Sequence, residues 1–344
     1  MHQLGWNKGI AAIVLAGLGA AAIAAQAQTA TPGVLKDSTP TPYHRIEGFA
    51  NTLPKEQQWG AVTGVAVQGG HLWVVERCGQ NSCDGSPDDP IIEFDMNGKP
   101  IKSFGGGLFV SPHGLTFDTD GNFYVADYQG KPGKGHVVYK FNQDGKILMT
   151  LGTPGVAGDG PNQFNEPNEV AIAPNGDLFV ANGHSIKSDS AARIVKLTPD
   201  GKFIKAWGKL GTGPGEFRFP HTLRFDSLGR LWVADRANNR LQVFDQDGKY
   251  LAEYKQFGRP VGLDIEGDTI IVADSESTPA SNPGYTRGRG ITIGNWKTLQ
   301  VTAFIPLEGD DIKPGTSGPE DVQMSGGAVY AGMITQKLFA KYVK

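Results

Sequence analysis

One pattern of apolar and polar positions recurs six times along the chain. Each copy has alternating apolar residues, then a turn containing Gly, then a second apolar run, which is the signature of a β-hairpin. Further short apolar runs follow, so each unit predicts four antiparallel strands. Units spaced 40 to 59 residues apart with this content are typical of β-propeller blades. The six copies begin at Thr63, His113, Asn168, His221, Val261 and Glu320.

The two ends of this repetitive region complement each other. The last unit ends at Lys344 after three strands, and the segment beginning at Tyr43 supplies a further strand before the first unit. Pairing the two would close the ring and remove its exposed sheet edges. We therefore expect an all-β, six-bladed β-propeller that forms a single domain over residues 43–344, closed by an N-terminal strand in the last blade. Residues 28–42 are polar and Pro-rich, which predicts a flexible leader.

Residues 1–27 have the pattern of an export signal. Lys8 precedes an apolar stretch from Ile10 to Ile23, and Ala25-Gln26-Ala27 supplies the small residues of a cleavage site after Ala27. An uncleaved membrane anchor is the alternative, but the run of about 14 residues is shorter than the roughly 20 that span a bilayer. We expect a periplasmic or secreted protein with no membrane span in the mature chain.

Charge and cysteine content narrow the possible partners. The formal net charge is −3 at pH 7, so no strongly basic surface is expected and nucleic acid is not predicted as a partner. We expect a monomer that acts on a small-molecule or peptide substrate. The two cysteines, Cys78 and Cys83, predict a local disulfide in an oxidising compartment. The alternative is a pair of metal-binding thiolates, although two thiolates alone do not complete a zinc site.

The residues that begin alternate blades predict a metal site. The first strand of each blade lines the central channel, and alternate blades of a six-fold ring lie about 120° apart. His113, His221 and Glu320 begin blades two, four and six, so their side chains can converge on the axis. Two imidazoles and one carboxylate leave a position open for water or substrate, as in catalytic zinc sites. The alternative is that each His only fills the channel. The repeat itself does not require His, because the equivalent positions are Thr63, Asn168 and Val261.

Three segments carry a family resemblance. They are PHGLTFDTDGNFYVAD from Pro112, RIVKLTPDGKFIKAWG from Arg193 and GEFRFPHTLRFDSLGRLWVADRANNRLQVF from Gly215. Through them, residues 59–344 resemble the peptidyl-α-hydroxyglycine α-amidating lyases (peptidylamidoglycolate lyases), within the wider group of NHL-repeat propellers. The resemblance implies a zinc ion on three axial histidines, of which His113 and His221 match two. At the third position this chain departs from the family, because Glu320 stands there.

The resemblance also implies a structural calcium ion. Asp321 matches the carboxylate ligand of that ion, and Val65 and Leu115 match the residues whose backbone carbonyls bind it. Hard oxygen donors of this kind suit calcium. The alternative for Asp321 is an ordinary aspartate of a turn or a strand edge.

Catalysis in the family requires arginines around the substrate and a tyrosine that acts as a base on the substrate hydroxyl. Arg77 and Arg236 match the arginines, and a guanidinium suits a substrate carboxylate. The position of the tyrosine is occupied by His184, whose imidazole can also act as a base. The reaction implied by the resemblance splits a carbinolamide into an amide and glyoxylate.

Two other functions fit a six-bladed propeller. The first is a calcium-dependent hydrolase of the lactonase or gluconolactonase kind, in which Glu320, Asn168 and Glu169 would be channel ligands with a His as base. His113 and His221 favour zinc over calcium and therefore argue against this hydrolase. The second is a non-catalytic NHL-repeat propeller that binds partners. The longest irregular insertion, Glu276 to Gly290, is interpreted as a lid over the channel mouth or a disordered loop.

Overall fold

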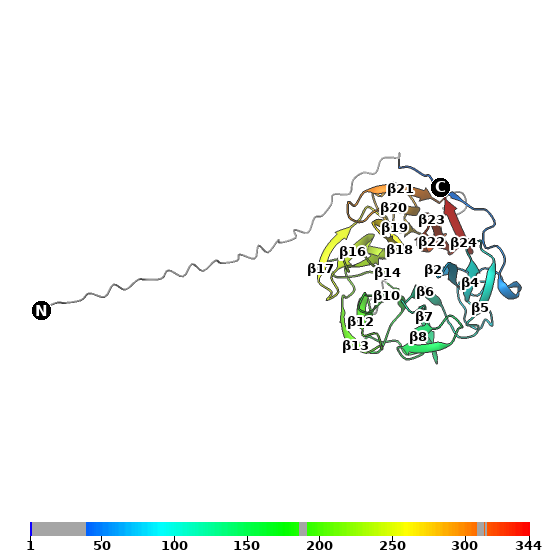
Figure 1. Ribbon diagram of the computed structural model, residues 1–344, viewed down its shortest axis with the longest axis horizontal. Helices are drawn as coiled ribbons and strands as arrows, with labels where there is room; N and C mark the ends of the chain where they lie inside the picture. Colours follow the sequence, from blue (N-terminus) through cyan, green and yellow to red (C-terminus); the bar gives the residue numbers. More distant parts are fainter. Residues whose placement is uncertain (2–38, 186–190, 308–312, 314) are drawn as a thin grey trace.

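Six four-stranded antiparallel sheets stand around a central axis in the computed structural model (Figure 1). The structure describes Met1 and residues 39–185, 191–307, 313 and 315–344. The predicted signal peptide and nearly all of the predicted leader lie outside the described residues. Within the described residues there is no α-helix, and two short 3-10 turns, η1 (Pro54–Glu56) and η2 (Arg236–Asn238), interrupt the strands. The predicted all-β, six-bladed propeller is confirmed.

Blades one to five are each built from four consecutive strands. Blade one contains β2 (Val62–Gln68), β3 (His71–Glu76), β4 (Ile91–Asp95) and β5 (Pro100–Phe104). Blade two contains β6 (Pro112–Phe117), β7 (Phe123–Lys131), β8 (Lys134–Phe141) and β9 (Ile147–Leu151). Blade three contains β10 (Pro167–Ile172), β11 (Leu178–Asn182), β12 (Arg193–Leu197) and β13 (Phe203–Trp207). Blade four contains β14 (Pro220–Phe225), β15 (Leu231–Asp235), β16 (Arg240–Phe244) and β17 (Tyr250–Tyr254). Blade five contains β18 (Pro260–Glu266), β19 (Thr269–Asp274), β20 (Gly290–Asn295) and β21 (Val301–Pro306).

Blade six joins the two ends of the ring. It contains β22 (Pro319–Ser325), β23 (Ala328–Met333) and β24 (Leu338–Val343), and its outer strand is β1 (His44–Arg45) from the start of the propeller. In this antiparallel pairing His44 lies opposite Val343 and Arg45 lies opposite Tyr342. The N-terminal strand therefore completes the last blade, as the sequence predicts, and the C-terminus lies beside it (Figure 1).

The hydrophobic core lies between the blades. The buried apolar side chains form six clusters, and each cluster draws its members from two neighbouring blades. Trp73 and Phe123 pack together between blades one and two, for example, and Trp232 and Trp296 belong to one cluster between blades four and five. The cluster between blades six and one contains Tyr330 and Phe94, so the ring is closed by packing as well as by strand pairing.

A bulge at the start of every inner strand sets the direction of the axial side chains. The pairing of the first and second strands shifts register at this point in all six blades, for example between His113 and Leu115 and between Pro319 and Asp321. Bulges of this kind re-aim side chains next to sites at the rim of a sheet. The shifted positions include His113, His221 and Glu320, so the bulges belong to the construction of the central site.

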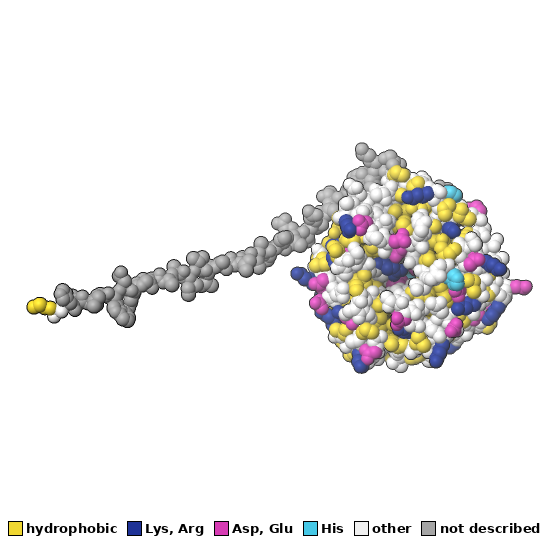
Figure 2. All heavy atoms as spheres, in the orientation of Figure 1, with side chains coloured by type: hydrophobic (Ala, Val, Ile, Leu, Met, Phe, Trp, Pro, Cys, Tyr) yellow, Lys and Arg dark blue, Asp and Glu magenta, His cyan; other side chains and the backbone are white. Residues whose placement is uncertain are grey.

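Cys78 and Cys83 form the predicted disulfide, which closes the loop after β3. Among the described residues, no helix is long and apolar enough to cross a membrane. Lys and Arg side chains are interspersed with Asp and Glu on the face of the disc that Figure 2 shows.

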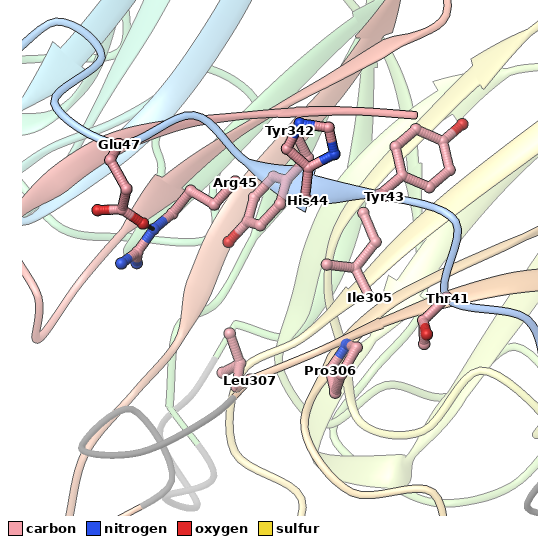
Figure 3. Close-up of a pocket in the computed structure, with 9 residues that line it drawn as sticks. All are labelled: Thr41, Tyr43, His44, Arg45, Glu47, Ile305, Pro306, Leu307 and Tyr342. Atoms are coloured by element: carbon pink, nitrogen blue, oxygen red, sulfur yellow. Dashed lines mark hydrogen bonds and ion pairs between the residues drawn. The ribbon is translucent and has the colours of Figure 1, made fainter.

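A surface groove lies where the N-terminal strand closes the ring, away from the propeller axis. It has a volume of about 380 Å³ and lies where β1 passes blade five (Figure 3). Its lining includes Tyr43, His44 and Leu307, and Arg45 beside it is paired with Glu47 at 3.1 Å. It contains none of the residues that the sequence assigns to the site.

Candidate metal centre

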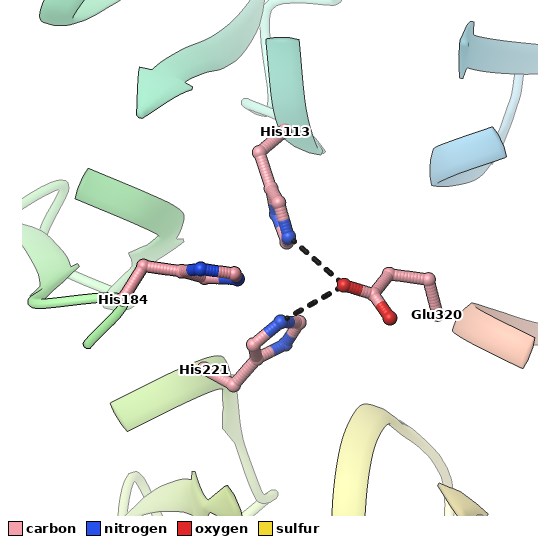
Figure 4. A group of neighbouring side chains, drawn as sticks. All are labelled: His113, His184, His221 and Glu320. Carbon is pink, nitrogen blue, oxygen red and sulfur yellow. Dashed lines mark hydrogen bonds and ion pairs between the residues drawn. The ribbon is translucent and has the colours of Figure 1, made fainter. Parts of the chain in front are cut away.

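Three imidazoles and one carboxylate meet on the axis of the propeller. His113, His221 and Glu320 project from the inner strands β6, β14 and β22, and His184 follows β11 (Figure 4). Each of the four offers one ligand atom, and these atoms all lie within 4.8 Å of one another. The structure thus brings together the three residues that the blade positions predict and adds His184 as a fourth donor.

The tautomers of the two axial histidines follow from their outer hydrogen bonds. His113 Nδ1 lies 3.2 Å from the carbonyl oxygen of Asn168, and His221 Nδ1 lies 3.0 Å from that of Val261. Because a carbonyl only accepts hydrogen bonds, each Nδ1 carries a proton, and each Nε2 presents a lone pair when its imidazole is neutral. These two Nε2 atoms lie 3.3 and 3.2 Å from the same carboxylate oxygen of Glu320. Three electron-pair donors therefore point at one another, an arrangement that a cation stabilises.

Burial and mutual charge determine the ionisation of these groups. Burial lowers the pKa of His113 to about 3, although its hydrogen bond to Glu320 opposes this shift. Burial also lowers the pKa of His184 well below its usual value. For Glu320, burial acts to raise the pKa, but His221 and Arg236 outweigh it and hold the pKa well below its usual value. His113 and His184 are therefore neutral imidazoles and Glu320 is an ionised carboxylate, and these are forms that bind metals.

A backbone hydrogen bond and two ring contacts hold His184 beside the centre. Its backbone N–H donates to Glu166 Oε2 at 3.0 Å, and its ring packs against Tyr128 and Phe219 with centroid distances of 4.5 Å each. Its centroid lies 5.4 Å from that of His113 and 5.3 Å from that of His221. Its Nε2 is buried and has no hydrogen-bond partner among the described residues. The residue at the predicted base position is thus available either as a base or as a ligand.

The two predicted arginines have different partners. Arg77 donates to the side-chain oxygen of Asn81 at 2.6 Å and to the carbonyl of Pro112 at 3.3 Å, both of them uncharged acceptors. Its buried Nη2 has no hydrogen-bond partner in the described part of the chain. Arg236 Nη2 lies 2.5 Å from Glu276 Oε1, and its Nη1 lies 4.0 Å from Glu320 Oε1. Arg77 therefore has no carboxylate partner among the described residues, whereas Arg236 is paired with Glu276.

Tyr128 is a further residue of the centre that the sequence analysis does not identify. Its ring carries the guanidinium of Arg77 at 5.0 Å and lies 5.8 Å from the ring of His113. In β7 of blade two, Tyr128 comes directly after Asp127, as Arg77 follows Glu76 and Arg236 follows Asp235. The residue after the second-strand carboxylate thus recurs at the channel mouth, and this register is the signal that could have identified Tyr128.

The residues assigned to calcium surround a guanidinium. Asp321 accepts the N–H groups of Val65 and of Val322, both at 2.9 Å, and Val65 and Leu115 lie on the adjacent inner strands β2 and β6. Arg224 Nη2 lies 3.7 Å from Asp321 Oδ1. Burial raises the pKa of Asp321 to about 8, although Arg224 opposes this shift.

The guanidinium of Arg224 also lies close to the carboxylates of the channel residues Glu169 and Asp264. Arg224 lies 3.4 Å from the carboxylate of Glu169 and 3.7 Å from that of Asp264. Thr116 donates to Glu169 at 2.6 Å, and Asn168 donates to the carbonyl of Pro220 at 2.8 Å. The structure thus places Asn168 and Glu169 in contacts that link neighbouring inner strands.

Known proteins resemble this chain in sequence and in fold. The NHL repeat family matches residues 217–244. NHL repeat-containing protein 3 of Mus musculus is 39% identical over 308 residues, which cover 84% of this chain and 82% of that protein. Peptidyl-alpha-hydroxyglycine alpha-amidating lyase 1 of Drosophila melanogaster is 30% identical over 278 residues, covering 70% of this chain and 49% of that protein.

Two further similarities are partial or limited to the fold. The peptidylglycine alpha-amidating monooxygenase of Rattus norvegicus is 35% identical over 230 residues, which cover 59% of this chain. The chain matches only 22% of the length of that relative. Virginiamycin B lyase from Staphylococcus aureus superposes with a TM-score of 0.53 at 16% identity, covering 88% of this chain and 99% of that one. This structural likeness supports the propeller fold.

Proposed function

Since this chain belongs to the family of NHL-repeat six-bladed propellers that includes NHL repeat-containing protein 3 and the peptidyl-α-hydroxyglycine α-amidating lyases, we propose that it is an exported, zinc-dependent lyase. Its substrate would be an α-hydroxyglycine derivative, a carbinolamide, and its products an amide and glyoxylate. The observation that carries this proposal is the meeting of His113, His221 and Glu320 at one point on the axis.

The donor set fits zinc. Two imidazoles with their Nε2 atoms directed inward and one ionised carboxylate match the ligand types of catalytic zinc sites, with His184 close by. The Nδ1 contacts to the backbone carbonyls are the outer-shell bonds that orient such ligands. Zinc bound there would act as a Lewis acid toward the substrate hydroxyl oxygen. Because Glu320 replaces a neutral ligand, the net charge of the ion and its ligands falls from +2 to +1, and this polarisation should be weaker than with three histidines.

The other residues of the centre bind the substrate and move one proton. Arg77, through its unpaired Nη2, and Arg236 would together donate to the substrate carboxylate. The neutral Nε2 of His184 would accept the proton of the substrate hydroxyl. As the C–O bond becomes a carbonyl, the bond between the α-carbon and nitrogen breaks and its electron pair remains on nitrogen. His184 then returns the proton to that nitrogen, so the step balances as amide plus glyoxylate.

The proposal does not extend to calcium. The residues that the resemblance assigns to this ion do not fit it, because the guanidinium of Arg224 already lies among the carboxylates of Asp321, Glu169 and Asp264. Asp321 is also occupied as an acceptor of two backbone N–H groups. A second cation in the same place would meet the charge of Arg224, so we propose that this arginine takes the place of the calcium.

Glyoxylate release tests the proposed activity. N-benzoyl-α-hydroxyglycine incubated with the purified protein should yield benzamide and glyoxylate, whereas N-benzoylglycine, which lacks the hydroxyl, should yield neither. Arg77→Met should raise the KM for the first compound more than it lowers kcat, because the arginine is assigned to binding. A zinc-loaded protein that releases no glyoxylate would overturn the lyase assignment.

A further inference from the structure

The side-chain carboxylate of Glu276 is paired with two arginines, Arg236 and Arg259, at the channel mouth. It begins the irregular segment between β19 and β20. One of its oxygens lies 2.5 Å from Arg236 Nη2, and the other lies 3.4 Å from Arg259 Nε. Ser317 donates to the first oxygen at 3.0 Å. Two guanidiniums and one hydroxyl therefore form a built receptor for a single carboxylate.

Arg236 does not depend on Glu276 for its position. It lies in η2, its backbone N–H donates to the carbonyl of Phe219 at 3.1 Å, and its guanidinium lies 5.1 Å above the Phe219 ring. Its side chain is 8% exposed. Its buried Nε has no hydrogen-bond partner among the described residues. This guanidinium is thus fixed in place and retains an unused donor.

Glu276 is the exchangeable member of the group. Its side chain is 30% exposed, against 8% for Arg236 and 15% for Arg259. The backbone beneath it is anchored, because the N–H groups of Glu276 and Ser277 both donate to Asp274. Rotation of the side chain toward solvent would therefore free both guanidiniums without moving the segment.

The donors that face Glu276 favour exchange over addition. Arg236 Nη2 and the hydroxyl of Ser317 both meet one oxygen of Glu276, and Arg259 Nε meets the other. A substrate carboxylate can therefore reach these donors only by replacing Glu276.

The family resemblance already assigns Arg236 to the substrate. We propose that Arg259 completes a carboxylate-binding subsite with it at the channel mouth, and that Glu276 occupies this subsite as an internal competitor until a carboxylate ligand displaces it. This inference rests on the proposed function for the nature of the ligand, a small molecule with a carboxylate next to an acylated nitrogen. It assigns to the segment from Glu276 a role in selection of the ligand. It also gives Arg259 a role as a second guanidinium of the subsite.

Binding measurements with the Glu276→Gln variant test the inference. N-benzoylglycine, which has a carboxylate, and N-benzoylglycinamide, which does not, are titrated calorimetrically into the wild-type protein and the variant. A competitor that fills the subsite nine-tenths of the time weakens apparent binding about tenfold, so the variant should bind the carboxylate about tenfold more tightly and the amide equally well. The matched control is Glu253→Gln, which breaks the 2.7 Å ion pair with Arg240 away from the channel and should change neither affinity.

The sign of the effect separates two roles for Glu276. If it merely positions Arg236, the variant should bind the carboxylate more weakly, and that result or an unchanged affinity would overturn the proposal. Ser317→Ala provides a milder second variant, because it removes one hydrogen bond that holds Glu276, and it should move the affinity in the same direction by a smaller factor. Since the readout is binding, tighter binding without any glyoxylate release would retain this inference while refuting the lyase, and active enzyme with unchanged binding would do the reverse.

Discussion

His113 Nε2 lies 3.3 Å from Glu320 Oε1, although the two residues are 207 positions apart in the sequence. On the other side of the imidazole, His113 Nδ1 meets the backbone carbonyl of Asn168 and carries the proton. The Nε2 atom that faces the carboxylate of Glu320 therefore carries a lone pair. A cation between or beside two electron-rich atoms at this distance would stabilise them. This pair, together with His221, is the basis of the proposed metal centre.

Replacing the carboxylate of Glu320 by an amide should turn the contact between two electron-rich atoms into a hydrogen bond. In Glu320→Gln the amide NH₂ can donate to an imidazole Nε2, so the metal-free variant should be more stable to unfolding than the metal-free wild type, by about 1 kcal/mol. The same variant should lose zinc affinity. Chemical denaturation of both proteins after treatment with a chelator measures the difference. A clear loss of stability in the variant would mean that the carboxylate is satisfied without a metal.

Removing the imidazole of His184 should slow the proposed reaction without loss of zinc from the centre. His184→Phe keeps the packing against Tyr128 and Phe219 but cannot accept a proton, so kcat should fall roughly 10²- to 10⁴-fold. Zinc content should stay unchanged, since His113, His221 and Glu320 remain. His184→Tyr, which restores the residue type that the family resemblance implies, should recover part of the rate. Full activity in the Phe variant would exclude His184 as the base.

Arg224 should make the protein indifferent to calcium. The melting temperature of the wild-type protein should be the same in EGTA and in calcium chloride. Arg224→Met leaves three buried carboxylates without their cation, so its free energy of unfolding in EGTA should fall by about 3 to 5 kcal/mol, and calcium should restore part of it. Arg230→Met, which removes a more exposed partner of Asp226, is the control and should show a small loss that calcium does not alter. Stabilisation of the wild-type protein by calcium would contradict the assignment.

Glu76 should give the fold a dependence on pH. Burial raises the pKa of Glu76 from its ordinary 4.5 to about 7, although its hydrogen bonds from Gly79 and Gly60 oppose the shift. Between these two pH values the unfolded chain releases a proton that the folded protein keeps, so stability falls as pH rises through this window. The loss should level off above pH 7 at a maximum of about 3 kcal/mol. Denaturation of wild type and Glu76→Gln at pH 5 and pH 8 isolates this contribution. An equal change in both proteins would assign the pH dependence to other groups.

The axial residues could be predicted because their positions follow from the repeat. Six aligned inner strands place their first residues at one mouth of the channel, so His113, His221 and Glu320 had to approach one another once the ring was recognised. The bulges that turn them inward are local features of each blade. The position of His184 was predicted only through the family resemblance, because it lies after β11 rather than on an inner strand.

The roles of Arg224 and Glu276 could not be predicted in the same way. Each depends on side chains that come from other blades and vary independently of the repeat. Arg224 follows His221 on the same strand, but its three carboxylate partners lie on the inner strands of blades three, five and six. Glu276 lies in an insertion, and nothing in the sequence relates its length to the position of Arg236.

The metal content of the purified protein tests the central claim most directly. Inductively coupled plasma mass spectrometry should find about one zinc per chain in the wild type, in line with a single set of axial ligands. His113→Ala and His221→Ala should each lose that zinc, whereas His71→Ala, a histidine of β3 outside the centre, should keep it. A wild-type protein without zinc, or zinc that persists in both axial variants, would contradict the metal centre and the lyase built on it.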